Sequence, residues 1–259
     1  MKTQGRFTYA ILDIKTMAMR SLLKSIRSPD TLLLNIAIPV MTMLVFVYVF
    51  GGAMNTGDTS YINYIFPGVL LLCIGQSGSA TALSVSTDIQ KGVIDRFRSM
   101  PITRSSVLIG HVLEAMVRTI VTVILILMIA LLVGFRTSAG IVGWLTAFGL
   151  LLLFSLTITW ISVAFALAVN SPEAAGSFTM FVMLFSYLSS GFVPTDTLTK
   201  VLRIFAENQP MTPIIESLRA LLLDTALDNN LLYAILWCVG LLIVAYILAV
   251  QMYKRKLAK

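Results

Sequence analysis

Six long apolar segments are the feature of this sequence that most restricts how the chain can fold. They cover residues 30–51, 62–86, 107–133, 141–169, 174–193 and 230–252. Each reaches the roughly 20 residues that a helix needs to cross the hydrocarbon core of a bilayer. Only 12% of the 259 residues are charged, and the mean hydropathy is +0.90, whereas ordinary soluble domains carry about 25% charged residues. The sequence therefore predicts an all-α polytopic membrane protein with six transmembrane helices in a single domain, 1–259.

Shorter sequence patterns predict helices and helix boundaries in the rest of the chain. Residues 7–27 keep an apolar face and a basic face through about five helical turns, so an N-terminal interfacial helix is expected within 1–29. The motif NSPEAAG at 170–176 predicts a helix start that separates the fourth and fifth spans, with Ser171 as the N-cap and Pro172 in the first helical position. Residues 194–229 hold two amphipathic stripes too short to cross a bilayer, which we interpret as interfacial or re-entrant helices.

The distribution of lysine and arginine predicts the orientation. If the N-terminus lies inside, 15 of the 19 basic residues fall on inner segments. The outer segments hold the other four, Arg136, Lys200, Arg203 and Arg219. Basic residues beside spans collect on the cytoplasmic side, so both termini and the connection between spans two and three are predicted to be cytoplasmic. This topology accounts for the net charge of +7, and no nucleic-acid partner is expected.

Residues suited to ion coupling or catalysis are sparse. Glu114 and Arg118 lie four residues apart near the inner end of span three, where an ion pair on the helix surface is expected. His111 is the one histidine of the sequence, and we interpret it as an interfacial hydrogen-bonding residue. No phosphate-binding G-x-x-x-x-G-K-[ST] motif occurs. The sequence therefore disfavours an ion-driven carrier and predicts neither a cofactor nor a metal in this chain.

The stretch GQSG at 75–78 has two interpretations. It is similar to the serine motif of intramembrane rhomboid proteases, but Ser77 would need a base within hydrogen-bond reach, and His111 lies at the cytoplasmic edge of the next span. Small residues at helical spacing instead allow two helices to approach closely in lipid. Those residues are Gly75, Gly78, Ser79 and Ala82. Helix packing is the expected role.

Uncharged polar side chains within the spans also have two interpretations. They could line the path of an amphiphilic substrate, or they could form hydrogen bonds between helices, and the sequence supports both. The candidate translocation-path residues are Asn35, Thr42, Gln76, Ser77, Thr157 and Thr159.

The segment TDIQKGVIDRFRSMPITRSSVLIG, residues 87–110, gathers charge between two apolar spans. Four apolar residues share one side of a predicted helix, charged residues occupy its other sides, and Pro101 ends it. A compact cytoplasmic segment of this mixed character suits docking onto a protein partner.

This segment resembles the cytoplasmic segment of ABC type-2 exporter permeases, in particular the daunorubicin/doxorubicin-resistance permease family. That family has a glycine, an acidic–arginine pair and an R-S-x-P motif before span three, matched here by Gly92, Asp95, Arg96, Arg98, Ser99 and Pro101. SIRSPDTLLLNIAIPVMTMLVFVYVFGG is similar to the start of the family's first span. SSGFVPTDTLTKVLRIFAENQPMTPIIESLRALL is similar to its extracellular region, with matches at Gly191, Pro194, Asn208, Pro210 and Arg219. The resemblance covers essentially the whole chain.

The resemblance implies a six-span permease half that forms a homodimer or heterodimer and works with two copies of a separate cytoplasmic ATPase subunit. ATP and Mg would be bound by that subunit. The segment 88–101 would be a coupling helix received by a groove on the ATPase. The residues implied in coupling are Asp88, Gly92, Asp95, Arg96, Phe97, Arg98 and Pro101.

The domain plan that follows is an interfacial helix at 1–29, spans one to five in 30–193, extracellular re-entrant helices in 194–229, and span six with a basic tail in 230–259. The family exports antibiotics, other hydrophobic compounds, lipids and glycan conjugates. We expect a multi-pass protein of a prokaryotic cytoplasmic membrane that exports a hydrophobic or amphiphilic compound. The alternative function is a stand-alone channel or an ion-driven secondary transporter; an intramembrane hydrolase is a third.

Overall fold

The computed structural model describes residues 2–27, 29–52, 60–93 and 106–258, and within these ranges the chain is helical without strands. The first elements are α1 (Lys2–Ile26), α2 (Pro29–Val45), the π-helical turn η1 (Phe46–Phe50), α3 (Tyr61–Gln90) and α5 (Ser106–Val133). The next are α6 (Ile141–Ala168), α7 (Pro172–Gly176), α8 (Phe178–Tyr187) and the short turn η2 (Thr195–Thr197). The last are α9 (Lys200–Asn208), α10 (Met211–Leu223) and α11 (Asn230–Ala258).

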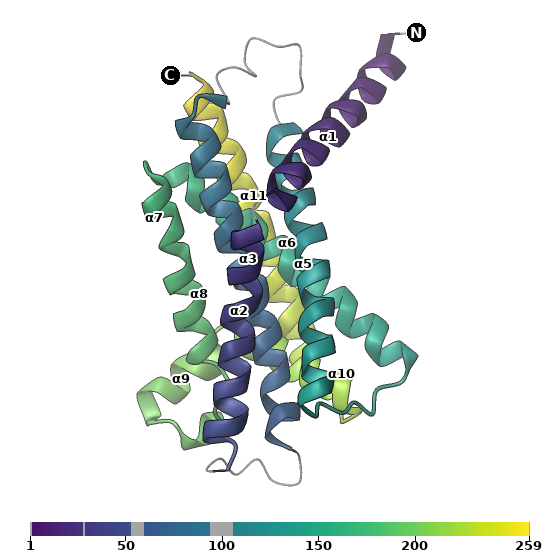
Figure 1. Ribbon diagram of the computed structural model, residues 1–259, viewed down its shortest axis with the longest axis vertical. Coiled ribbons are helices and arrows are strands. Elements are labelled where there is room, and N and C mark those ends of the chain that lie inside the picture. Colours follow the sequence, from purple (N-terminus) through teal and green to yellow (C-terminus); the bar gives the residue numbers. More distant parts are fainter. Residues whose placement is uncertain (1, 28, 53–59, 94–105, 259) are drawn as a thin grey trace.

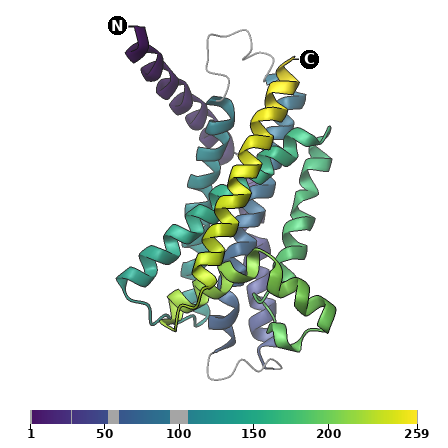
Figure 2. The ribbon, with the colours of Figure 1, turned by 180° about the vertical axis from the view of Figure 1, so that it is seen from behind.

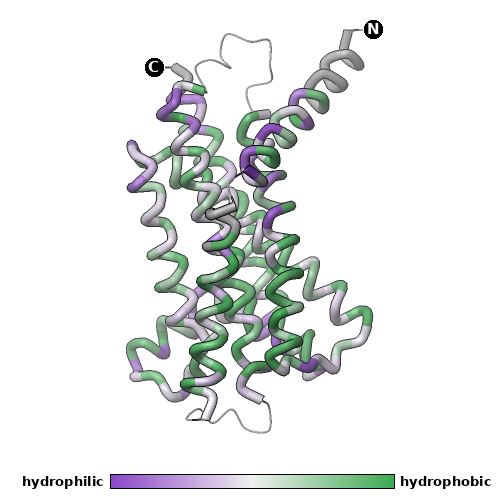
Figure 3. The backbone as a smooth tube through the Cα atoms, in the orientation of Figure 1, coloured by the Kyte–Doolittle hydropathy of each residue, from purple (hydrophilic) through white to green (hydrophobic). Residues whose placement is uncertain are grey.

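Four of these helices, α3, α5, α6 and α11, are long and apolar enough to cross a membrane. They form a bundle along the long axis of the molecule, and α1 leans away from it at one end (Figure 1). Seen from behind, α11 crosses in front of α6, and the two helices are in contact (Figure 2). The middle of the bundle is apolar, and hydrophilic residues collect toward its two ends (Figure 3). The chain is therefore a polytopic membrane protein, as its apolar segments predict.

The N- and C-termini lie at the same end of the bundle (Figure 1). The C-terminal end of α3 and the N-terminal end of α5 also lie at this end, which we call the terminal end. The opposite end carries α9, α10 and the start of α6 (Figures 1 and 2). The two helix ends that flank residues 94–105 therefore lie at the same end as both termini.

The first predicted span, 30–51, is not among the four long apolar helices. Helix α2 continues into η1, so the helical backbone extends from Pro29 to Phe50. Its apolar part, Asn35–Phe50, is shorter than that of the long helices. Pro39 lies inside α2, where its missing N–H removes one backbone hydrogen bond.

The fifth predicted segment, 174–193, was expected to be one continuous span, and this boundary prediction is wrong. The helix starts as predicted, because Ser171 Oγ accepts a hydrogen bond from Ala174 N at 3.1 Å. It then breaks at Ser177, whose hydroxyl donates to Ala174 O at 2.7 Å, and α8 ends at Tyr187. Serine hydroxyls compete with the helical backbone for its carbonyls, which is why the apolar run alone overestimates the helix.

Glycines let α3 lie very close to its neighbours, which confirms helix packing as the role of the small residues at 75–78. A Cβ atom on Gly75 would overlap Val182 Cγ1 of α8, and one on Gly78 would lie 2.6 Å from Ile158 Cγ2 of α6. A Cβ atom on Gly68 would lie 2.8 Å from the Cα of Gly191 in the turn after α8. Close backbone approach of this kind is how small residues stabilise helix pairs in lipid.

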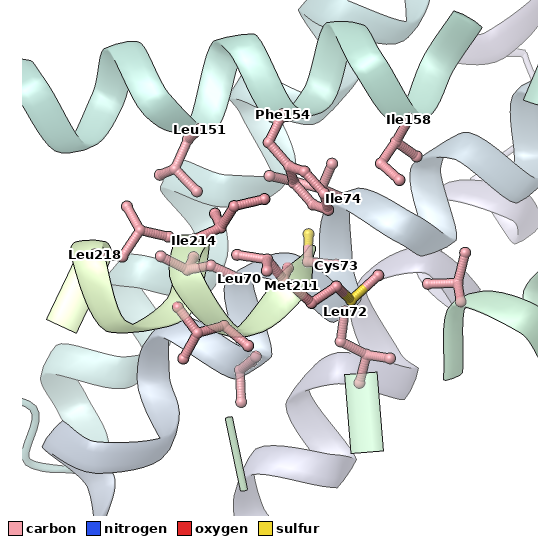
Figure 4. Packing of buried hydrophobic residues seen from close by; sticks show 14 of the residues in the cluster. Leu70, Leu72, Cys73, Ile74, Leu151, Phe154, Ile158, Met211, Ile214 and Leu218 are labelled. Carbon is pink, nitrogen blue, oxygen red and sulfur yellow. The ribbon is translucent and has the colours of Figure 1, made fainter. Parts of the chain in front are cut away.

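Helices α9 and α10 lie in the range 194–229, where two short helices are expected. α10 is enclosed by the bundle: its Met211, Ile214 and Leu218 are buried and pack among side chains of α3 and α6 (Figure 4). Arg219 holds α10 in place, since its Nη2 donates to Ser190 O at 2.7 Å and to Tyr64 O at 3.1 Å. The guanidinium also lies 3.8 Å from the centre of the Tyr64 ring.

Candidate functional site

The terminal end of α3 leads into the segment that the sequence singles out for partner docking. The helix ends at Gln90, and Gly92 adopts a φ of 64°, with its N–H donating to Ile89 O at 3.1 Å. Left-handed backbone is accessible to glycine without the strain that a Cβ atom causes. Gly92 therefore helps to end α3 with a left-handed residue, which gives this candidate coupling residue a conformational role.

A Gly92→Ala substitution is expected to lower the free energy of unfolding by about 1 kcal/mol, because alanine is strained in left-handed backbone. Thermal unfolding of the purified protein in detergent measures this change. The matched control is Gly149→Ala in α6, where an added Cβ meets nothing within 4 Å; alanine there should not destabilise the helix. Equal effects of the two variants would contradict the role assigned to Gly92.

Helix α1 crosses α5 next to this end of α3. A Cβ atom on Gly110 of α5 would lie 2.8 Å from the Cβ of Met17 of α1, so the two helices approach closely there. This crossing carries the basic face of α1 toward the last turns of α3.

Asp88, one of the predicted coupling residues, is buried in the last turn of α3 and binds side chains of two other helices. Lys24 Nζ donates to its Oδ1 at 2.8 Å, and Arg20 Nη2 donates to its Oδ2 at 3.3 Å. His111 Nε2 of α5 lies 3.3 Å from the same Oδ2. We call these four residues the Asp88 cluster. A buried carboxylate needs such partners, so the cluster ties the ends of α1, α3 and α5 together.

A second group of polar residues, the Arg118 cluster, lies deeper between α3 and α5. Arg118 donates through Nε to Ser77 Oγ at 3.2 Å and through Nη2 to Ser77 O at 2.9 Å and Thr81 Oγ1 at 2.6 Å. Its Nη1 lies 3.0 Å from Glu114 Oε1. Thr119 donates to Ser77 Oγ at 2.9 Å. These contacts fix α5 against the middle of α3.

The Arg118 cluster corrects one sequence expectation. Glu114 and Arg118 do pair four residues apart, but their side chains are only 3% and 6% exposed. The pair therefore lies between helices and not on a helix surface. Arg118 finds acceptors on α3 that its own helix cannot supply, and this makes burial of the guanidinium tolerable.

The hydrolase alternative finds no support in this geometry. Ser77 Oγ is held by Arg118 and Thr119, while His111 Nε2 faces Asp88. Among the contacts of the described residues, Ser77 and His111 are held by different partners. A nucleophile and its base would have to be within hydrogen-bond reach of each other.

The remaining predicted coupling residues lie outside the described residues. They are Asp95, Arg96, Phe97, Arg98 and Pro101. Their roles stay predictions, whereas Asp88 and Gly92 are placed at the start of the segment that contains them.

Three of the candidate path residues have partners within the bundle. Thr157 Oγ1 donates to Leu153 O in its own helix at 2.9 Å and to Cys238 O of α11 at 3.0 Å. Thr159 Oγ1 donates to the carbonyl one turn earlier in α6 at 2.7 Å. Ser77 belongs to the Arg118 cluster. These hydroxyls join helices or cap their own backbone, and the structure does not bring them together into one group.

The other three candidates lie on α2 and α3. Thr42 Oγ1 is 3.4 Å from the hydroxyl of Tyr187 at the end of α8. Asn35 and Gln76 are buried, and their side-chain amide nitrogens have no hydrogen-bond partner among the described residues. A role in a translocation path stays a prediction for all six.

We did not predict from the sequence that Arg20, Lys24 and His111 belong to a candidate site. Arg20 and Lys24 were assigned to the polar face of the N-terminal helix, and His111 to the interface. The signal that could have found them is their spacing: Arg20 and Lys24 lie one helical turn apart, so one carboxylate can face both. Among the described residues, no group of His, Cys, Asp and Glu could hold a metal ion.

Comparisons with known proteins match the part of the chain that contains the two polar clusters. A family model described as ABC-2 type transporter matches residues 13–223, a range that contains both polar clusters. The chain is 28% identical over 229 residues to the daunorubicin resistance ABC transporter permease protein DrrB1 of Streptomyces coeruleorubidus, covering 88% of this chain and 81% of that protein. It is 22% identical over 237 residues to the probable doxorubicin resistance ABC transporter permease protein DrrC of Mycobacterium tuberculosis, covering 91% and 86%.

Proposed function

We propose, from the premise that this chain belongs to the ABC-2 type transporter family, that it is the permease subunit of an ATP-binding cassette exporter. The exporter moves a hydrophobic or amphiphilic compound out of the cell, using ATP hydrolysed by a separate subunit. The names of the relatives point to antibiotics as the first compounds to test; lipids and glycan conjugates are the other candidates. The observation that carries the proposal is the Asp88 cluster, because it joins three helices where the docking segment begins.

The proposed coupling route starts at the segment 88–101. ATP-driven closure of the ATPase dimer displaces this segment, which begins in the last turn of α3 and precedes α5 in the chain. The contacts of Asp88 with Arg20, Lys24 and His111 add α1 to the same unit. A push on the segment then tilts three helices together and shifts the permease between inward-open and outward-open states. Coupling of this kind requires a two-state element that both sites bias.

In this proposal two further helical segments cross the membrane in addition to the four long helices, which gives six crossings. The helix from Pro29 to Phe50 has 17 residues in α2 and 5 in η1, about 33 Å of helix at 1.5 Å per residue. Helices α7 and α8, with Ser177 between them, span 16 residues from Pro172 to Tyr187, about 24 Å by the same rule. Six crossings leave both termini on one side, in agreement with their position at the same end in Figure 1.

The partners follow from the family. Two copies of a cytoplasmic ATPase subunit bind ATP and Mg, and a second permease copy, identical or different, completes the transporter. In this proposal the protein lies in the cytoplasmic membrane of a prokaryotic cell. The basic residues beside the spans support a cytoplasmic position for both termini. Helices α9 and α10 then lie on the extracellular side, with α10 as a re-entrant helix.

One observation favours the alternative of an ion-driven carrier. Glu114, Arg118 and His111 are ionisable residues buried in a long apolar helix, and such residues frequently mark ion or proton pathways. Each already has a charged partner in the structure, which favours the structural role. Transport by the purified chain alone, driven by an imposed proton or sodium gradient, would support the carrier.

Phe97→Ala is expected to lower transport and drug-stimulated ATP hydrolysis at least fivefold while leaving the amount of chain in the membrane unchanged. Truncating an aromatic side chain that is a hot spot of a docking surface costs about 2–4 kcal/mol of binding. ATP hydrolysis in proteoliposomes with daunorubicin as probe measures the effect. Phe181→Ala, an exposed phenylalanine of α8, is the matched control. Unchanged transport in Phe97→Ala would remove this residue from the proposed interface.

Co-purification tests the proposal as a whole. We expect the neighbouring reading frame to encode an ATPase subunit. That subunit is co-expressed with tagged chain and solubilised in mild detergent. We expect the two to purify together and the ATP hydrolysis of the complex to respond to candidate substrates. A chain that purifies without any ATPase, under conditions where it remains folded, would contradict the proposed function.

A further inference from the structure

An apolar cavity lies between α3, α5 and α6, at the end of the bundle opposite the termini. It has a volume of about 450 Å³, and every side chain that lines it is aliphatic or aromatic. Its inner wall includes Phe66 of α3 and Ala147 of α6, which are buried. Ile141 and Leu145 of α6 also line it and are exposed. The cavity therefore suits a hydrocarbon that enters from the side of the bundle.

The size of the cavity indicates what can fill it. At about 30 Å³ for each water-sized group, it holds about 15 methylene-sized groups, close to one acyl chain of a phospholipid. It extends along α6 from Ile141 to Leu151, which is about 15 Å of helix. A partner helix of that length and about 10 Å across would need about 1,200 Å³. A helix of a second copy therefore does not fit into this space, whereas one acyl chain does.

The position of the cavity matches one boundary of the bilayer. Helix α6 begins at this end, and its first turns lean away from α5 (Figure 1). Trp144 lies in the first turn of α6 and lines the cavity. Tryptophan collects where acyl chains meet headgroups. Because α3, α5 and α6 are long and apolar enough to cross a membrane, the cavity faces acyl chains just below a layer of headgroups.

Arg136 brings a positive charge to the connection between α5 and α6 that borders the cavity. It is exposed and lies three residues before Ala139, which lines the cavity. Its Nη1 donates to the carbonyl oxygens of Leu131 at 3.0 Å and Phe135 at 2.8 Å. None of the ion pairs among the described residues includes Arg136. The rest of its guanidinium can therefore donate to a phosphate, whose oxygens match the arginine fork.

We propose that this cavity binds one acyl chain of a phospholipid of the bilayer, and that Arg136 contacts the phosphate of the same lipid. The aliphatic and aromatic walls hold the chain, and the charge of Arg136 fixes the headgroup at the end where α6 begins. Bound in this way, the lipid fills the space that α5 and α6 leave between them. The site lies apart from the Asp88 and Arg118 clusters, and lipid binding to it does not depend on an ATPase subunit.

Native mass spectrometry of the full-length chain, delipidated in detergent, tests the phosphate contact. The two probes are phosphatidylglycerol and diacylglycerol with the same acyl chains, because diacylglycerol lacks the phosphate. Wild-type protein should bind phosphatidylglycerol about fivefold more tightly, as expected for one exposed charge-assisted contact. Arg136→Gln should remove this preference and leave diacylglycerol binding unchanged. Lys200→Gln, which removes an exposed basic residue of α9 at the same end, should change neither affinity.

The same measurement tests the acyl chain with variants of α6. Ala147→Leu fills the inner part of the cavity and should weaken both lipids about tenfold, because about two methylene groups of the chain lose their place. Gly149→Leu is the matched control, since Gly149 is exposed and an added Cβ meets nothing within 4 Å; both affinities should stay unchanged. If Ala147→Leu does not fold, Leu145→Trp fills the cavity from its exposed side and takes its place.

The proposal is overturned if the variant with the filled cavity binds phosphatidylglycerol as tightly as wild type, or if Arg136→Gln keeps the preference over diacylglycerol. Glycerol phosphate without acyl chains is the third probe, and we expect far weaker binding than for the lipid. Binding as tight as the lipid's would instead assign Arg136 to a soluble phosphate ester. A delipidated chain that binds neither lipid but forms dimers, which Ala147→Leu dissociates, would assign the cavity to a second copy.

Discussion

An Asp88→Asn substitution is expected to reduce transport at least tenfold while the ATPase subunit still co-purifies with the chain. Asparagine keeps the shape of the side chain but removes the charge that holds Arg20 and Lys24. Loss of a buried ion pair costs about 3–5 kcal/mol, but the side chains of Arg20 and Lys24 are 38% and 42% exposed, so we expect about 1–2 kcal/mol of destabilisation after solvent screening. Transport and ATP hydrolysis are measured in the same proteoliposomes.

The two readouts separate coupling from folding. If the Asp88 cluster transmits movement, the variant hydrolyses ATP without moving substrate in proportion, and Asp88→Glu, which keeps the charge, restores part of the transport. Asp228→Asn is the matched control because Asp228 is exposed. Transport by Asp88→Asn at the wild-type rate would show that the cluster does not carry coupling.

Arg118→Met is expected to have the largest effect on stability, about 3–5 kcal/mol. It leaves Glu114 as an unpaired buried carboxylate and removes the hydrogen bonds from Arg118 to Ser77 and Thr81. The matched control is Arg203→Met, which breaks a pair of the same sequence spacing with Glu207 on the surface, where the side chains are 49% and 42% exposed. We expect no measurable change there, because exposed ion pairs are screened by solvent. Thermal unfolding in detergent compares the two.

The double variant Glu114→Leu/Arg118→Met decides whether the buried pair is needed for transport. Replacing both partners by apolar residues of similar size is often nearly neutral for stability, so the double variant should recover most of what Arg118→Met loses. Recovered stability together with normal transport would assign the pair to folding. Recovered stability without transport would favour the ion-coupled alternative for these residues. A double variant as unstable as Arg118→Met would contradict the pairing described above.

The fold class follows from sequence because crossing a bilayer demands long apolar helices, and α3, α5, α6 and α11 meet that demand. Hydropathy does not record where serines interrupt a helix, so the segment 174–193 was predicted to be continuous, whereas the structure breaks it at Ser177 and ends it at Tyr187. The family resemblance, carried by motifs spread along the chain, is confirmed by the match over 13–223.

The candidate site could be predicted only in part. Spacing along one helix indicates that Glu114 and Arg118 pair, but it does not indicate which face of α5 meets α3. The acceptors that make burial possible, Ser77 and Thr81, lie on another helix and are separated from Arg118 by about forty residues in sequence. The assignment of Asp88 to coupling stays a prediction, and its contacts with α1 depend on how that helix crosses α5.

We propose that energy reaches this permease from a separate ATPase subunit through the ends of α1, α3 and α5. Transport of a fluorescent amphiphilic drug into proteoliposomes, with ionophores present to collapse every ion gradient, tests it most directly. The proposed coupling predicts that accumulation requires the ATPase subunit and ATP together, and that ionophores do not change it. Accumulation by the purified chain alone under an imposed ion gradient, without ATP, would contradict it.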